Sequence, residues 1–144
     1  LDAMMDLMET IPKYDIFAFF LPTCPFIESM SIKNGVAMLD DDTDSVVSVS
    51  YYEEPIQLAC IKKGEYIIPV FDNLTAGLTN SKFIQKYVKP NGGFYMSKWD
   101  NLLHERNFFK GSVKGVEIPH ERLVDIDYEC DLKKAEFMLS NTKK

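Results

Sequence analysis

The sequence of 144 residues lacks several features that would assign a protein to a class at once. No apolar run approaches the roughly 20 residues of a membrane span, and the longest, Ile16–Leu21, has the length of a strand. Basic residues are outnumbered, 16 Lys and Arg against 22 Asp and Glu, for a net charge of −6. This acidic balance argues against nucleic acid as a partner, and neither repeats nor low-complexity tracts are present. We expect no membrane or nucleic-acid partner.

Cysteine is also scarce. Cys24, Cys60 and Cys130 are odd in number and show neither a CxxC pair nor the spacing of a metal site. The pattern favours three reduced structural thiols in a cytoplasmic protein.

The first residues of the sequence have a helical pattern but lack the signal that usually begins a helix. Leu1, Met4, Met5 and Met8 have helical spacing, but no capping residue and no initiator methionine precede them. We expect these residues to continue a longer protein whose N-terminal part is missing.

What is present is the composition of a globular protein, with 46% hydrophobic and 26% charged residues. The first half alternates helical and strand patterns. The predicted order is a helix at the start, a strand over Tyr14–Leu21, a helix over Glu28–Leu39 and a strand over Ser45–Tyr51. This order is typical of an α/β fold. The aspartates within residues 40–44 are consecutive and diverge, which indicates a solvated turn rather than a metal site.

The strand at Tyr14–Leu21 is almost wholly apolar, so we predict that both its faces are buried in a parallel sheet covered by helices. The loop Pro22–Pro25 follows its carboxyl end, where ligands bind in open α/β sheets. The alternative for this loop is a plain connection.

The second half begins with a predicted β-hairpin, whose strands are Gln57–Ile61 and Glu65–Val70 and whose turn is Lys62–Gly64. Further predicted elements are strands over Val88–Ser97 and Val113–Ile118, and helices over Lys98–Arg106 and Asp131–Leu139. The Gly92–Gly93 pair allows close approach of a backbone or ligand, or forms a bulge.

Two aspartates, Asp125 and Asp127, flank Ile126 just after a short apolar run. If Leu123–Asp127 is extended, both carboxylates share one face while Val124 and Ile126 face the core. Two such oxygen ligands suit Mg²⁺, which keeps several waters and bridges to phosphates. The alternative is a solvated turn leading into the last helix.

Four stretches in this order resemble the C-terminal part of the CMP-N-acylneuraminate (sialic acid) cytidylyltransferases, from about Tyr14 to the end. They are "DIFAFFLPTCPF", "DSVVSV", "PNGGFYMSK" and "FFKGSVKGVEIPHERLVDIDYECDL". The resemblance implies a single partial Rossmann-like nucleotidyltransferase domain over residues 1–144, with a mixed, mostly parallel sheet and flanking helices. It also implies an inserted β-hairpin region, at about 53–105, for dimerisation and the sugar site.

The resemblance further implies a reaction and its site. A nine-carbon 2-keto sugar acid would attack the α-phosphate of CTP, giving a CMP-sugar and pyrophosphate. Asp125 and Asp127 would be the catalytic residues that bind Mg²⁺, and Asn91 and Tyr95 would line the sugar site. The resemblance also implies that a phenylalanine pair belongs to the substrate-binding residues and forms an apolar wall near the N-acyl group. The alternative is that these two side chains only pack in the core. The pair is Phe108 and Phe109.

The sequence departs from this family in two ways. The nucleotide-binding loop rich in Gly, Ser, Arg and Lys is absent, so we expect this chain alone to be inactive and to assemble as a homodimer or larger homo-oligomer. Four usually polar or basic positions are changed, so Lys82, Lys86 or Lys110 would have to bind the sugar carboxylate. The changed positions are Leu21, Ile27, Gln57 and Ser81. A different 2-keto sugar acid, or a non-catalytic oligomerisation or ligand-binding module, is therefore an alternative.

Overall fold

The structure is a computed structural model that describes residues 1–142. The chain forms two compact units, one of Leu1–Ser50 with Pro90–Lys144 and the other of Tyr51–Lys89. The second unit starts close to the expected insertion but ends at Lys89, and the remainder of that range, up to residue 105, belongs to the first unit.

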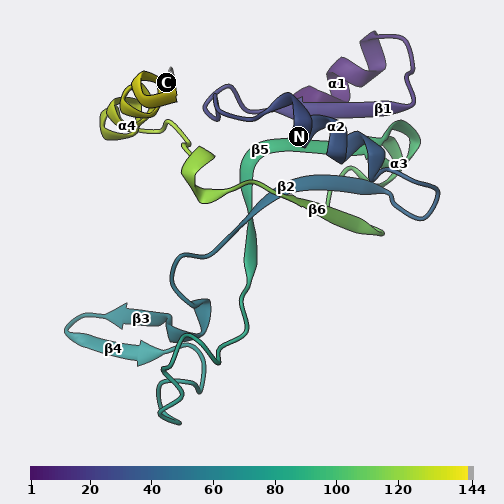
Figure 1. Cartoon of the computed structure of the whole chain (residues 1–144). Helices are drawn as coiled ribbons and strands as arrows, with labels where there is room; N and C mark the ends of the chain where they lie inside the picture. Colours follow the sequence, from purple (N-terminus) through teal and green to yellow (C-terminus); the bar gives the residue numbers. More distant parts are fainter. Residues whose placement is uncertain (143–144) are drawn as a thin grey trace. The chain divides into compact units, whose positions relative to one another are not determined.

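The first unit is built on a four-stranded mixed sheet (Figure 1). The strands are β1 (Ile16–Phe20), β2 (Ser45–Tyr51), β5 (Val88–Lys98) and β6 (Val113–Glu117), in the order β1-β5-β2-β6. β1 pairs with β5 antiparallel, whereas β2 pairs with β6 parallel. On β2 and β5, the Ser45 hydroxyl donates to Ser97 and the Ser48 hydroxyl contacts Phe94, so these two strands are antiparallel. The predicted mixed α/β sheet is confirmed, with β5 running against the other three strands.

Helices cover both faces of this sheet, as predicted. α1 (Asp2–Thr10) and α3 (Trp99–Glu105) pack on one face and α2 (Ser29–Ala37) on the other, whereas α4 (Glu129–Thr142) follows β6 in the chain. Side chains alternate between two clusters, because successive strand residues point to opposite faces. Val47 packs with residues of α1 and α3, whereas its neighbour Val46 packs with Phe94 and with Ile32 of α2. In the described part of the chain, no helix has the length and apolar character needed to cross a membrane.

β1 corrects one expectation, because it is an edge strand rather than a strand buried on both faces. It pairs with β5 alone among the described strands. Phe17 is buried, but Phe20 is 41% exposed. An apolar run does not distinguish the two arrangements, because burial depends on which strands and helices come to lie beside it. The side chain of Phe19 lines a cavity that is described below.

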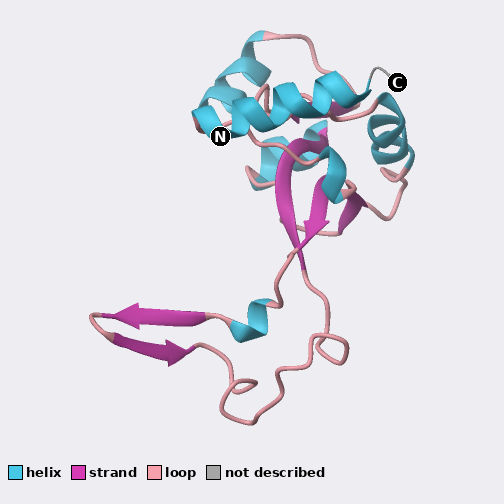
Figure 2. Cartoon of the chain, turned by 60° about the vertical axis from the view of Figure 1, so that its left-hand side comes forward, coloured by secondary structure: helices cyan, strands magenta, loops and turns pink. Residues whose placement is uncertain are grey.

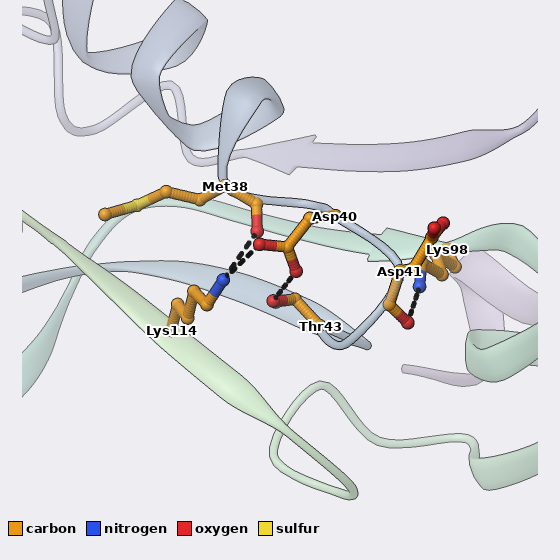
Figure 3. A network of polar contacts seen from close by, with 6 residues as sticks. All are labelled: Met38, Asp40, Asp41, Thr43, Lys98 and Lys114. Atoms are coloured by element: carbon orange, nitrogen blue, oxygen red, sulfur yellow. Dashed lines mark hydrogen bonds and ion pairs between the residues drawn. The ribbon is translucent and has the colours of Figure 1, made fainter.

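Two lysines that are distant in the sequence bind the acidic turn between α2 and β2 (Figure 3). The Lys114 ammonium lies 2.6 Å from an Asp40 carboxylate oxygen, and the Thr43 hydroxyl donates to the other oxygen at 2.5 Å. Lys98 donates to the Asp41 carbonyl oxygen at 3.1 Å. Asp40, Asp41 and Asp42 are exposed, as predicted for a solvated turn, but Lys114 of β6 pairs with the Asp40 carboxylate and Lys98 of β5 bonds the backbone of Asp41.

Acidification should weaken this turn. Hydrogen bonds from Lys114 and then Thr43 lower the pKa of Asp40 from its ordinary value of 3.8. Its contribution to the free energy of unfolding is therefore complete above about pH 4 and is lost as pH falls through the lower folded pKa. Urea unfolding should show wild type more stable than Asp40→Asn near neutral pH, with the gap closing in acid. The gap should be small, since Asp40 is 53% exposed.

The matched control is Asp42→Asn, which removes the same charge from the same turn. A gap between wild type and Asp40→Asn that is independent of pH would contradict the assignment.

The second unit contains a two-stranded antiparallel hairpin, seen as two arrows in Figure 2. A 3₁₀ turn, η1 (Ile56–Leu58), precedes β3 (Cys60–Lys63) and β4 (Tyr66–Pro69). Gly64 has a φ of +62° at the turn, a conformation that glycine adopts without steric strain. The predicted hairpin is confirmed, although Gln57 lies in the 3₁₀ turn instead of the first strand.

Candidate functional site

The side-chain amide of Asn91, on β5, has a hydrogen-bonded oxygen and an unpaired nitrogen. Its Oδ1 accepts hydrogen bonds from the Ser48 hydroxyl at 2.6 Å and from the Gly93 N–H at 3.2 Å. Because a backbone N–H can only donate, these contacts fix the orientation of the amide. Its Nδ2 is buried and has no hydrogen-bond partner among the described residues. An unpaired buried donor costs about 1–3 kcal/mol, so this position favours a ligand that brings an acceptor.

Gly92 lies next to Asn91 with a φ of +79°, in the left-handed region that favours glycine. A Cβ at this position would lie 3.0 Å from Leu21 Cδ1, 3.4 Å from Cys24 Sγ and 3.7 Å from Asp125 Oδ2. The missing side chain thus lets the loop after β1 and the acidic segment both approach the backbone of β5.

The acidic segment Leu123–Asp127 forms no strand. Its side chains nevertheless alternate as predicted, because Val124 is buried while Asp125 and Asp127 are exposed. The Ile126 N–H, between the two aspartates, donates to the Thr23 carbonyl at 3.0 Å. This single backbone bond replaces the strand pairing that the alternating pattern had indicated.

The first turn of α4 hydrogen-bonds to the backbone of the acidic segment at Asp127. The Asp131 carboxylate accepts hydrogen bonds from the N–H groups of Tyr128 at 2.9 Å and Asp127 at 3.3 Å. Glu129 and Asp131 both lie in the first turn of α4, where acidic side chains favour the positive end of the helix dipole. Asp127 is therefore positioned through its backbone by the cap of the last helix.

The thiol of Cys24 connects the acidic pair to β5. Cys24 is 7% exposed, and its Sγ donates to the Asn91 carbonyl at 3.6 Å. Burial, followed by the negative charge of Asp125 and a hydrogen bond to it, raises the pKa of this thiol above its ordinary 9.0, with a smaller contribution from Asp127.

Tyr95 lies between this polar region and an apolar cavity. Burial raises the pKa of its phenol above 10.0, and the Cys24 thiol and the Asp125 carboxylate add to that effect. Its ring centroid lies 5.6 Å from that of Phe108 and 6.3 Å from that of Phe109. The three aromatic residues that the family resemblance singled out therefore contact one another.

The cavity beside Tyr95 has a volume of about 400 Å³. Its lining is apolar except for the Asn107 side chain and the Tyr95 phenol. The lining residues are Leu1, Met4, Phe19, Leu21, Tyr95, Asn107, Phe108 and Phe109. Phe108 is buried in the core cluster under α1 and α3, so ordinary packing accounts for part of its role. Phe109 is 53% exposed, and core packing does not account for it.

The predicted donor set for a metal ion consists of two carboxylates, those of Asp125 and Asp127. Among residues 1–142, no group of three or more His, Cys, Asp or Glu side chains is arranged to hold a cation. A protein-only cage, as for structural Zn²⁺, is therefore not formed by the described residues. Asp125 and Asp127 fit Mg²⁺, which binds through one or two carboxylates and completes its shell with water and phosphate oxygens.

The four positions that depart from the family pattern lie in different surroundings. Leu21 lines the cavity, and Ile27 packs against the cluster around Phe94. Gln57 is buried and donates to the Gln85 carbonyl at 2.8 Å. Ser81 lines a cavity within the second unit, together with Lys82 and Lys86. All three cysteines are free thiols, as predicted, but Cys24 is buried whereas Cys60 and Cys130 are exposed.

Sequence reasoning missed the roles of Ser48, which holds the Asn91 amide, and of Cys24, whose thiol donates to the Asn91 carbonyl. It had expected the close approach that Gly92 allows. The signals available were a serine within an apolar strand, a cysteine in a loop at a strand end, and the glycine pair. None of them indicates by itself which distant residue it meets.

No protein-family model matches the chain. Over 124 residues, it is 28% identical to the N-acylneuraminate cytidylyltransferase of Escherichia coli. This match covers 85% of the chain but only 29% of that protein, so the chain spans less than a third of its curated relative.

The fold also matches a solved structure, that of a CMP:2-keto-3-deoxy-manno-octonic acid synthetase complexed with CTP. The TM-score is 0.60 over 98% of this chain and 68% of the other, at 13% identity. At this identity, the match supports the nucleotidyltransferase fold. The sequence match and this fold both agree with the resemblance to the CMP-N-acylneuraminate cytidylyltransferases that the four quoted stretches indicate.

Proposed function

We propose that this chain forms the sugar-acid and Mg²⁺ part of a cytidylyltransferase, which transfers CMP from CTP to a 2-keto sugar acid of the sialic acid type. The products are a CMP-sugar and pyrophosphate. The sequence match to an N-acylneuraminate cytidylyltransferase supports the reaction class. The observation that carries the proposal is the unpaired Asn91 amide, on the strand whose Gly92 lies beside Asp125 and whose Tyr95 lines the apolar cavity.

Asp125 and Asp127 are the proposed metal ligands. Bound there, Mg²⁺ would neutralise phosphate charge and lower the pKa of the sugar hydroxyl. The chain's own contribution is to hold the two carboxylates on one side, through the Thr23–Ile126 bond and the cap of α4. Phosphoryl transfer depends mainly on positioning and charge stabilisation, which are what these contacts supply.

The remaining residues fit a sugar acid that has an N-acyl group. Asn91 Nδ2 can donate to a carboxylate or hydroxyl oxygen, and the protonated Tyr95 phenol can donate at the boundary of the cavity. Phe108 and Phe109 offer an apolar wall on which an acyl methyl group can be buried. A polyhydroxyl tail would leave its hydroxyls largely unpaired in this cavity, so the N-acyl end is the better fit.

The changed positions leave the sugar open. Leu21, Ile27, Gln57 and Ser81 carry no positive charge, so they cannot supply the charge-assisted hydrogen bonds of a cation. A sugar acid other than N-acetylneuraminate, or a carboxylate bound by Lys82, Lys86 or Lys110, is the alternative within the same chemistry.

The second unit supports self-association. A two-stranded hairpin is marginally stable alone. The hairpin also exposes large apolar side chains, among them Tyr66 at 78% and Ile67 at 71%. Contiguous apolar surface of this kind is typical of an interface, which supports a homodimer or a larger homo-oligomer.

Saturation-transfer NMR on the 144-residue chain tests the proposal. With Mg²⁺ present, N-acetylneuraminate should bind, and its N-acyl methyl group should receive the strongest saturation. Asn91→Leu should weaken binding at least about tenfold, because the buried donor is lost. Asn34→Leu, at an exposed position of α2, is the matched control and should bind like wild type.

The other outcomes separate the alternatives. Equal binding of 2-keto-3-deoxy-octonic acid, which has no N-acyl group, would favour a different sugar acid. With CTP added, the same samples should release no pyrophosphate. Sugar-acid binding without any affinity for Mn²⁺ or CTP would favour the non-catalytic ligand-binding module. Binding of none of these sugar acids would contradict the proposed function.

A further inference from the structure

Ser48 lies on β2, the strand beside β5, and has no exposed surface. Its hydroxyl donates to Asn91 Oδ1 at 2.6 Å and accepts the Phe94 N–H at 2.8 Å. A second acceptor, the Phe94 carbonyl oxygen, is farther away at 3.2 Å. Because a hydroxyl has one proton, the shorter contact indicates that Asn91 Oδ1 receives it. Ser48 therefore joins the backbone of β5 to the side chain of Asn91.

Gly93 leaves the room in which the Ser48 hydroxyl reaches β5. A Cβ at this position would lie 3.0 Å from Ser48 Oγ and 2.6 Å from Ile27 Cδ1, too close for either neighbour to stay in place. The Gly93 N–H also donates to Asn91 Oδ1, at 3.2 Å. Two donors from different strands therefore meet on one oxygen atom.

These two donors decide which end of the Asn91 amide is free. If the amide were turned by 180°, its Nδ2 hydrogens would face the Gly93 N–H, which can only donate. The bond from Ser48 is the shorter of the two, at 2.6 Å against 3.2 Å, so Ser48 is the stronger hold on the amide. The Nδ2 group that is left over is buried and has no partner among the described residues. Asn91 is thereby fixed as a donor and favours an acceptor on the ligand.

We propose that Ser48 is a positioning residue for the sugar acid, whose hydroxyl orients the Asn91 amide so that Nδ2 donates to an oxygen of the ligand. The inference rests on the proposed function, in which Asn91 binds the sugar acid. Because Ser48 has no exposed surface, its effect on the ligand passes through Asn91.

The order of the Asn91 amide, measured without ligand, tests the positioning. The heteronuclear ¹H–¹⁵N NOE of its side-chain NH₂ group should fall in Ser48→Ala, because Oδ1 then keeps only the bond from Gly93. The matched control is Ser45→Ala. Ser45 is equally buried on β2, but its hydroxyl donates to Ser97 at 2.9 Å, so the NOE should not change. An unchanged NOE in Ser48→Ala would overturn the inference.

Saturation-transfer titrations with N-acetylneuraminate and Mg²⁺ test the effect on the ligand. Ser48→Ala should raise the dissociation constant about 3- to 10-fold, the usual effect of one hydrogen bond. In the Asn91→Leu background, the same substitution should change it less than about twofold, because the amide through which Ser48 acts is missing. Ser45→Ala should bind like wild type.

Two titration outcomes overturn the inference while the proposed function stands. One is wild-type affinity in Ser48→Ala. The other is an equal loss in both backgrounds, which would assign the effect to packing of the sheet. If the wild-type chain binds no sugar acid, the proposed function fails, and the role of Ser48 in it fails too.

Circular dichroism of each variant confirms that it is folded. If Ser48→Ala is not, Ser48→Cys takes its place, since a thiol is a weaker donor of similar shape. Wild-type affinity in a folded Ser48→Cys chain would then overturn the inference.

Discussion

Replacing Asp127 by Asn should abolish Mn²⁺ binding by this chain or weaken it at least about 100-fold. This loss is larger than the one expected when a residue that only hydrogen-bonds to a metal ligand is removed. The reason is that Mg²⁺ and Mn²⁺ bind an anionic carboxylate oxygen much more tightly than the neutral amide oxygen that would replace it. Asp127 is exposed, so the free energy of unfolding should change by less than about 0.5 kcal/mol. In a longer protein with transferase activity, the same substitution should abolish formation of the CMP-sugar.

Titration of free Mn²⁺ measures the first effect, and urea unfolding measures the second. The matched control is Asp6→Asn, which removes one exposed carboxylate from α1 and tests for a general effect of net charge. An Asp127→Asn chain with wild-type affinity for Mn²⁺ would remove the metal assignment.

Replacing Phe94 by Ala should destabilise the first unit by about 3–5 kcal/mol, the usual cost of emptying a fully buried phenylalanine site. Phe94 has no exposed surface and lies in the cluster that joins β5, β2 and β6. A Cβ on Gly35 would lie only 3.1 Å from its ring, so α2 packs directly on it. Since Asn91 and Tyr95 are on the same strand, the site should be lost with the fold.

Chemical denaturation of the variant measures this effect. Phe137→Ala is the matched control, because Phe137 is 70% exposed on α4 and its loss should change the free energy of unfolding by about 0.5 kcal/mol or less. A Phe94→Ala chain within about 1 kcal/mol of wild type would show that β5 is not the centre of the core.

Local patterns were sufficient to predict most elements of the first unit. Helical spacing at Leu1–Met8 and the β-branched run at Ser45–Tyr51 both correspond to elements of the predicted type. The apolar run at Tyr14–Leu21 indicated a strand correctly but its burial wrongly, because the position of a strand within a sheet is set by distant residues. The lysines that pair with the acidic turn, Lys98 and Lys114, could not be inferred for the same reason.

In the candidate site, too, local patterns predicted some features, whereas others depend on residues distant in the sequence. Alternation around Asp125 and Asp127 predicted which side chains are exposed, even though no strand forms there. The proximity of Tyr95, Phe108 and Phe109 was implied by family resemblance, and no periodicity indicates it. The hydrogen bonds of Ser48 with the Asn91 side chain, and of Cys24 with the Asn91 carbonyl, join residues 43 or more positions apart. Their existence depends on the tertiary fold alone.

The central claim is that the polar amide of Asn91 and the cavity beside Tyr95 bind a sugar acid with its N-acyl group among the aromatic rings. Intermolecular NOE spectra of the chain with N-acetylneuraminate and Mg²⁺ test it most directly. The account predicts contacts from the N-acyl methyl protons to the ring protons of Tyr95, Phe108 and Phe109. A bound sugar acid with methyl contacts only to residues of the second unit, or no binding at millimolar concentration, would contradict it.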